Sequence, residues 1–67
     1  MNNIGFRIKD IRTKSGVSQE QLAGYLGISA ATLSRYENMQ NVPKLPTIVA
    51  IAKAFNVSLD YLICGRQ

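Results

Sequence analysis

Few side chains in this sequence are suited to catalysis or to metal binding. The chain has one cysteine, Cys64, and no histidine, so neither a Ser–His nor a Cys–His pair can form and a structural zinc site lacks ligands. A metal-free carboxylate mechanism would have to use acidic residues that are scattered singly, without paired spacing: Asp10, Glu20, Glu37 and Asp60. We therefore predict that the protein is not an enzyme and holds no metal or cofactor.

The remaining chemistry is hydrogen-bond donation by basic and amide side chains. Eight Lys and Arg residues against four Asp and Glu residues give a net charge of +4 and a pI near 9.7. This balance favours polyanionic partners. Many small basic domains bind nothing anionic, so charge alone leaves nucleic-acid binding undecided.

The length of 67 residues limits the chain to one domain over residues 1–67. A domain this small needs tight helix packing or a second subunit, since a disulfide within the chain and a zinc site are excluded. Hydrophobic residues make up 46% of the sequence, which is typical of a folded protein. No apolar run approaches the ~18 residues that span a bilayer, and Met1–Phe6 lacks the apolar core of a signal peptide. We expect a soluble, cytoplasmic protein without a membrane partner.

Apolar spacing and capping residues predict an all-α domain. Ile4, Ile8 and Ile11 recur at helical spacing, and Ser15–Gly16 ends that pattern. Pro46 suits the first turn of a later helix. Serines that fit helix N-caps predict three further starts, at Ser18, Ser29 and Ser58. The five predicted helices lie near residues 3–15, 18–26, 29–38, 46–56 and 58–63.

The second and third predicted helices are joined only by Leu26–Ser29, which contains Gly27. Two helices separated by so short a turn cannot lie side by side as a long antiparallel hairpin. They match a helix-turn-helix, whose axes cross at ~90–120°. The inward residues of the third helix are then Leu33 and Tyr36.

Several stretches together resemble the lambda-repressor-like helix-turn-helix domains of phage repressors and Cro proteins, also called the XRE family. The stretches that carry the resemblance are Ile8–Ala23, with its Ser18-Gln19 and Leu22-Ala23 pairs, the turn Leu26–Ser29, the helix end Leu33–Asn38 and the closing Val57–Leu62. The resemblance implies a compact five-helix fold and a sequence-specific, DNA-binding transcriptional regulator.

Two features depart from the family pattern. Met39 stands where the family usually has glycine, so the third helix must end differently or with Asn38 in a left-handed conformation. The chain also stops four residues after Ile63. We expect either a Cro-like stand-alone regulator or a fragment of a larger repressor.

A helical wheel at ~100° per residue gives the third helix an outward face. In a helix-turn-helix this face enters the major groove. Arg35 can donate two hydrogen bonds to guanine, although a phosphate contact is the alternative. The alanines offer methyl groups for thymine or simply permit close approach. The face consists of Ala30, Ala31, Ser34, Arg35 and Asn38.

Residues beside this helix complete the predicted interface. The resemblance places Gln19 at the DNA backbone, where the second helix begins, and Ser29 can cap its helix and also touch DNA. Polar residues after the third helix can line phosphates or be ordinary loop residues: Asn38, Gln40, Asn41 and Lys44. The resemblance also implies a structural pair between Arg12 and Glu37, which would leave Arg12 near the DNA backbone as well; two unrelated surface charges are the alternative.

Double-stranded DNA is the expected partner, bound as a palindromic operator by a homodimer. We expect a repressor that covers promoter DNA; activation by contact with polymerase is the alternative. We expect the dimer contact at the Val42–Leu45 loop and the Leu59–Ile63 helix, including Leu62. Phe6 lies off the apolar stripe of the first helix, so it belongs to an interface or is covered by the C-terminal segment. Cys64 is expected to be an inert thiol rather than an intermolecular disulfide.

Two other function classes remain as alternatives. The fold can serve as a protein-interaction module, such as an antitoxin or inhibitor, and exposed apolar residues outside a dimer patch would favour this function. An RNA-binding role is disfavoured because Tyr36 points inward and few aromatic stacking platforms remain.

Overall fold

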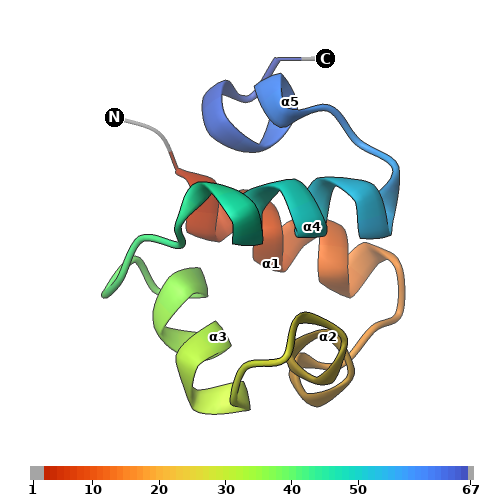
Figure 1. The fold of residues 1–67 in the computed structure, drawn as a ribbon. Helices are drawn as coiled ribbons and strands as arrows, with labels where there is room; N and C mark the ends of the chain where they lie inside the picture. Colours follow the sequence, from red (N-terminus) through yellow and green to blue (C-terminus); the bar gives the residue numbers. More distant parts are fainter. Residues whose placement is uncertain (1–2, 67) are drawn as a thin grey trace.

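The computed structural model describes residues 3–66, which form five α-helices and no strand (Figure 1). The helices are α1 (Ile4–Lys14), α2 (Gln19–Leu26), α3 (Ala30–Glu37), α4 (Leu45–Phe55) and α5 (Leu59–Cys64). The predicted all-α, five-helix architecture is confirmed, and each helix end lies within one residue of its predicted position.

Serine side chains begin three of the helices, as their positions in the sequence indicate. The hydroxyls of Ser18, Ser29 and Ser58 accept hydrogen bonds from backbone N–H groups three residues later, at 3.0, 3.0 and 2.9 Å. At Ser18 the side chain of Gln21 also accepts a bond from the Ser18 N–H, at 2.8 Å, which completes a capping box. The starts of α2 and α3 are therefore fixed by local sequence.

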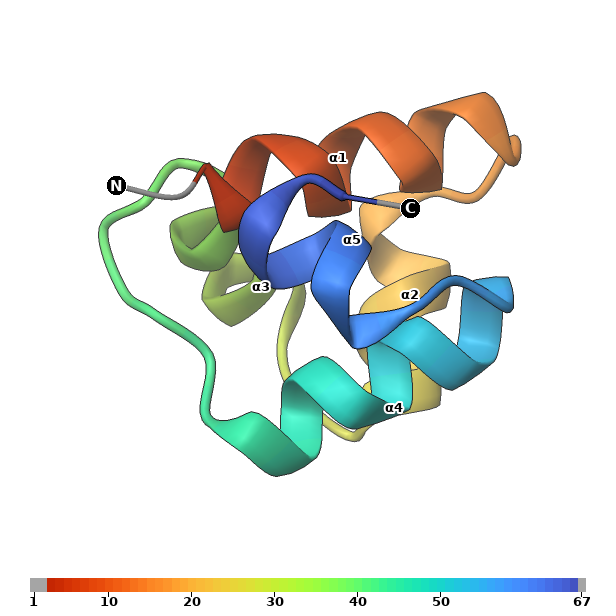
Figure 2. The ribbon, with the colours of Figure 1, turned by 90° about the horizontal axis from the view of Figure 1, so that it is seen from above.

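One apolar core joins all five helices. Its fully buried side chains come from α1, α3, α4 and α5 and are Ile8, Leu33, Ile51 and Leu62. Leu22 of α2 is almost as deeply buried. Figure 2 shows α5 lying between α1 and α4, and it packs on both.

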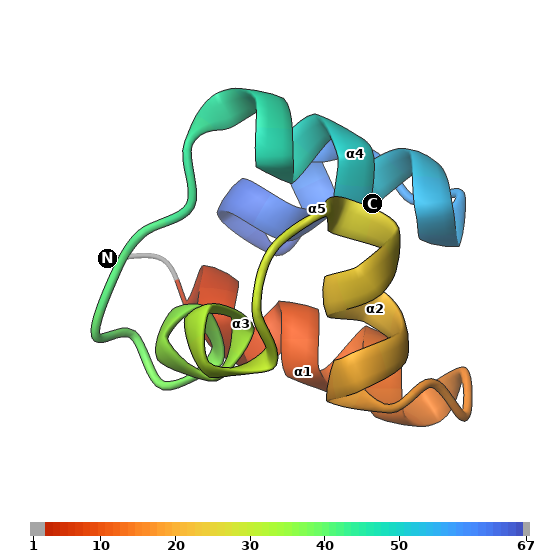
Figure 3. The same ribbon diagram turned by 60° about the horizontal axis from the view of Figure 1, so that its bottom comes forward.

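The turn between α2 and α3 is short, and the two helices cross rather than run antiparallel (Figure 3). Gly27 ends α2 in the left-handed conformation, with φ of 73°. α3 packs against α1 and α2. This arrangement leaves the far side of α3 open to solvent.

The structure decides between the alternatives that the sequence leaves open at the end of α3 and at Phe6, and it agrees with the inward assignment of Tyr36. Asn38 is not left-handed, since its φ is −94°; Met39 itself takes that conformation, with φ of 61°. Phe6 is 61% exposed, so the described C-terminal residues do not cover it. Tyr36 is half-buried against the core, as its inward assignment predicts.

Arg7 connects the two ends of the described chain. Its Nε and Nη2 atoms donate to the carbonyl oxygens of Leu62 and Ile63, both at 2.9 Å. These carbonyls belong to the last turn of α5, where backbone acceptors have no partner within the helix. Arg7 therefore caps the C-terminus of α5 with a charged donor and holds α5 on α1.

Replacing Arg7 by methionine keeps the aliphatic stem and removes both donors. We expect Arg7→Met to lower the free energy of unfolding by about 1–3 kcal/mol, because two carbonyls lose charge-assisted bonds. Thermal melting measures the effect. Lys9→Met, at an exposed position of the same helix, is the matched control, and equal melting temperatures for the two variants would contradict this role of Arg7.

Candidate nucleic-acid interface

Most of the residues predicted from the sequence to contact DNA lie on α3 or beside it, although Arg12 is buried. Residues 3–66 contain no detectable pocket and no cluster of His, Cys, Asp or Glu side chains that could hold a metal ion. No helix among these residues is long and apolar enough to cross a membrane. The candidate site is the exposed side of α3, with the start of α2 on one flank and the segment that follows α3 on the other.

Arg35 is the most prominent side chain on this surface. It is exposed, and neither of the ion pairs among the described residues involves it. Ala31, one turn earlier, is also exposed. The two residues are four apart, so a cation and a methyl group share one face of α3.

The other members of the predicted outward face are less available. Ala30 is half-buried and packs against the core, so its outward assignment is wrong. Ser34 is half-buried, and its hydroxyl accepts a bond from Asn38 Nδ2 at 3.4 Å. The Ser29 hydroxyl caps α3 and lies 2.8 Å from Thr32 Oγ1, so it is already hydrogen-bonded within the protein.

The segment after α3 folds back onto the end of the helix. The N–H groups of Gln40 and Asn41 both donate to the carbonyl of Arg35, at 2.8 and 3.3 Å. Both residues are exposed. They therefore flank Arg35, whereas Lys44, also exposed, lies further along at the start of α4.

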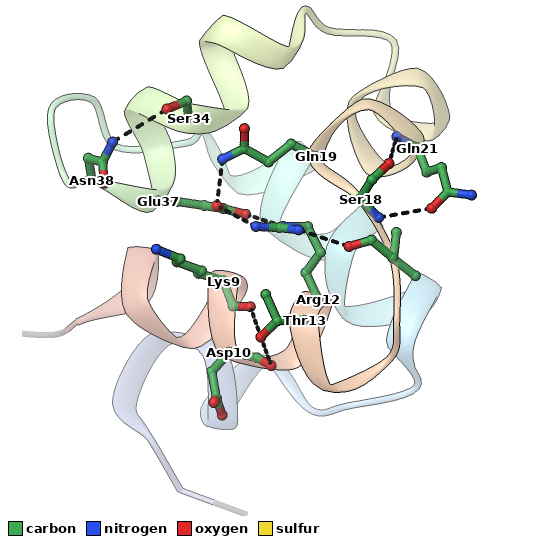
Figure 4. Close-up of polar contacts among 11 residues, drawn as sticks. Lys9, Asp10, Arg12, Thr13, Ser18, Gln19, Gln21, Ser34, Glu37 and Asn38 are labelled. Carbon is green, nitrogen blue, oxygen red and sulfur yellow. Dashed lines mark hydrogen bonds and ion pairs between the residues drawn. The ribbon is translucent and has the colours of Figure 1, made fainter.

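A buried ion pair fixes α3 from its inner side (Figure 4). Arg12 Nε donates to Glu37 Oε2 at 2.6 Å, and Arg12 Nη2 donates to Glu37 Oε1 at 3.0 Å. The exposed side-chain fractions are 9% for Arg12 and 1% for Glu37. A third nitrogen, Nη1, donates to the carbonyl of Val17 at 2.8 Å, which holds the loop between α1 and α2.

The structure thus contains the pair that the family resemblance implies. The expected nearness of Arg12 to a DNA backbone stays a prediction. The guanidinium is buried and bonded to two other residues of the protein, so it is not presented as an exposed donor.

Gln19 donates to the same carboxylate, a contact that the sequence did not predict. Its Nε2 donates to Glu37 Oε1 at 2.9 Å, and Figure 4 shows its side-chain oxygen turned away from Glu37. Gln19 is half-buried. One N–H of the amide therefore serves the fold, and the second remains to donate elsewhere. The signal in the sequence was only that Gln19 opens α2, since its partner is 18 residues away.

Glu37 consequently accepts three hydrogen bonds from two helices while it ends a third. Its partners lie on α1 and α2, which places those helices and α3 in one fixed arrangement. The chain also matches a family of known proteins. A family model described as helix-turn-helix matches residues 8–62. The chain belongs to the lambda-repressor-like helix-turn-helix family.

Individual members of this family resemble the chain over most of its length. It is 36% identical over 63 residues to the SPbeta prophage-derived uncharacterized HTH-type transcriptional regulator YonR of Bacillus subtilis, covering 94% of this chain and 58% of YonR. The P22 c2 repressor, solved in complex with a synthetic operator, superposes with a TM-score of 0.89 at 30% identity over 98% of this chain and all of that one. The biofilm master regulator SinR, solved in complex with DNA, gives a TM-score of 0.79 at 30% identity over 88% of this chain and 95% of that one.

Coverage differs between the two kinds of comparison. The chain spans about half the length of the curated relatives it matches, 58% in the case of YonR. The resemblance therefore concerns the helix-turn-helix domain that the two chains share.

The residues expected at a dimer contact are exposed in part. Val42 and Leu45 are 62% and 59% exposed, and Leu59 is 38% exposed. Leu62 has no exposed surface and belongs to the core, so its assignment to an interface is wrong. In a helix of six residues, the side-chain pattern alone does not show which leucine faces the core. The neighbouring helices decide this.

Removing the charge of Glu37 tests the ion pair. We expect Glu37→Gln to lower the free energy of unfolding by about 3–5 kcal/mol, because the buried Arg12 guanidinium loses its anionic partner. Thermal melting, or urea unfolding, measures this loss, and Glu37→Ala acts in the same direction. Glu20→Gln removes the same charge from an exposed position and should change stability by no more than about 0.5 kcal/mol. A Glu37 variant as stable as the Glu20 variant would show that the pair contributes nothing.

Proposed function

We propose that this chain is a transcriptional regulator that binds a palindromic operator as a homodimer, with α3 in the major groove of double-stranded DNA. The observation that carries the proposal is the outer side of α3. It presents Arg35 and Ala31 to solvent while the inner side is fixed by Glu37 and Leu33. The likeness to regulators solved with operator or other DNA supports this function.

Each exposed group has a definite task in this proposal. Arg35 donates two hydrogen bonds to O6 and N7 of a guanine, a contact worth about 1–3 kcal/mol of discrimination. Ala31 offers a methyl group to the C5-methyl of a thymine. Asn38, Gln40, Asn41 and Lys44 donate to phosphates on one flank, and the second N–H of Gln19 does so on the other.

The charge distribution agrees with this division of tasks. Two of the four acidic side chains form ion pairs within the chain: Glu37 with Arg12 in the interior, and Asp10 with Lys14 at the surface, at 3.1 Å. Arg35 and Lys44 form no such pair among the described residues. Their cationic groups are therefore free to interact with DNA, Arg35 with a base and Lys44 with a phosphate.

Repression follows from occupancy in this proposal. A dimer that covers two half-sites about one helical turn apart would block access of polymerase to a promoter. The exposed side chains of Val42, Leu45 and Leu59 supply the apolar contact between the two copies.

A second function is favoured by two aromatic side chains outside that contact. Phe6 on α1 and Tyr25 on α2 are 61% and 64% exposed. A protein-interaction module would use such residues to bind another protein, and DNA binding would then be weak or absent. The two rings lie singly on separate helices, and single exposed apolar residues are common, so the DNA function is the better supported of the two.

Selection of bound sequences from a random duplex library tests the proposal directly. We expect recovery of a two-fold symmetric site with half-sites about one helical turn, ~10 base pairs, apart. Affinity for the recovered duplex should fall steeply with salt, with a slope in log–log form near −0.9 per neutralised phosphate and ~6–10 phosphates per dimer. If selection enriches no sequence and any binding is independent of the salt concentration, DNA binding is contradicted and the protein-partner function is favoured.

Arg35→Ala separates base readout from backbone contact. If Arg35 binds guanine, the variant loses about 1–3 kcal/mol per half-site on the selected duplex and loses its preference for G·C at one symmetric position. Fluorescence anisotropy on that duplex and on a copy with the guanine changed gives both numbers. Lys53→Ala removes the same charge from an exposed site on α4 and should preserve the preference. An equal loss by Arg35→Ala on both duplexes would assign Arg35 to phosphate.

A further inference from the structure

Met39 lies directly after α3 and has an unusual backbone. Its φ is 61°, the left-handed conformation that glycine adopts freely and that is strained for a residue with a long side chain. Asn56 is the one other non-glycine residue with positive φ among residues 3–66, and asparagine tolerates that region far better. Something in the fold must hold Met39 in this conformation.

The sulfur of Met39 supplies a contact of that kind. The N–H of Gly5 donates to Met39 Sδ at 3.2 Å, across 34 residues of sequence. Gly5 is the second residue of α1, so its N–H has no acceptor within its own helix. The thioether thus satisfies an otherwise unpaired donor and joins the start of α1 to the end of α3.

The space around this contact is tightly filled. Gly5 is buried. A Cβ placed on Gly5 would lie 2.8 Å from Met39 Sδ and 2.9 Å from the Glu37 carbonyl oxygen, and closer still to that of Tyr36. The backbone of α1 therefore approaches the last turn of α3 so closely that a Cβ on Gly5 would collide with two backbone carbonyls and with the sulfur.

Oxidation of the sulfur would add an oxygen atom to the group that accepts the Gly5 N–H. A peroxide transfers one oxygen to the thioether: the O–O bond breaks, an S–O bond forms, the sulfur loses two electrons and the peroxide is reduced to water or an alcohol. The product is a polar, chiral sulfoxide. Met39 is only half-buried, so a small oxidant can reach it.

We propose that Met39 is an oxidation-sensitive lock that holds the end of α3 against the start of α1. Conversion of its thioether to the sulfoxide by a peroxide separates these helices and lowers the stability of the domain. The same change weakens operator binding, since Glu37 and Arg35 lie only two and four residues before Met39. This last consequence rests on the proposed function, whereas the loss of stability does not.

The test uses the full chain in a Cys64→Ala background, so that the exposed thiol does not react. Hydrogen peroxide is added, and peptide mass mapping quantifies sulfoxide at Met39 and at Met1, which lies outside the described residues. We expect the melting temperature to fall by about 4 °C or more and to recover after treatment with methionine sulfoxide reductases. Met39→Leu, which has a similar shape and no sulfur, is the matched control and should not respond; Met39→Gly, which needs no strained conformation, is a second control.

Either of two results would contradict this role of Met39. One is full oxidation of Met39 with an unchanged melting temperature, and the other is an equal fall in the melting temperature of Met39→Leu after peroxide treatment. Resistance of Met39 under conditions that oxidise Met1 would overturn it as well. Affinity for a duplex recovered by selection should drop about tenfold on oxidation, equivalent to about 1.4 kcal/mol, with no change for Met39→Leu. If the melting temperature falls as expected but neither form binds any duplex, the lock is supported and the proposed DNA function fails.

Discussion

The arrangement of α1, α2 and α3 depends on the hydrogen bonds that the buried Glu37 carboxylate accepts from Arg12 and Gln19. A buried charge is costly unless it is paired and fully hydrogen-bonded. Here its two oxygens accept two bonds from Arg12 and one from Gln19. Because these donors come from different helices, the carboxylate is satisfied only when all three helices occupy their native positions. The ion pair therefore specifies a geometry as well as contributing energy.

That geometry gives α3 two different sides. Leu33 and Glu37 anchor the inner side in the core and the ion pair, while Ala31 and Arg35 remain outside. A reading helix needs this combination, since base contacts require side chains held in fixed positions on a rigid element. The close approach of Gly5 to the end of α3 adds a second fixed point on the same helix.

Local features of the sequence predicted the helices well because each is encoded within a few residues. The serine caps and the helical spacing of Ile4 and Ile8 required no knowledge of the rest of the fold. Contacts across the chain could not be predicted in this way. The bonds from Gln19 to Glu37 and from Gly5 to Met39 join residues 18 and 34 apart, and only packing reveals them. The outward assignment of Ala30 failed for the same reason: a wheel drawn from α3 alone does not show what packs against its first turn.

The most direct test of α3 as the DNA-reading helix is a titration of the protein with a selected duplex, monitored through the backbone amide NMR signals. We expect the largest shifts on α3 around Ala31 and Arg35, and at the start of α2 around Gln19, with little change at Lys53 of α4. Shifts concentrated instead around Phe6 and Tyr25, or on α4 and α5, would contradict the assignment of α3 as the DNA-reading helix.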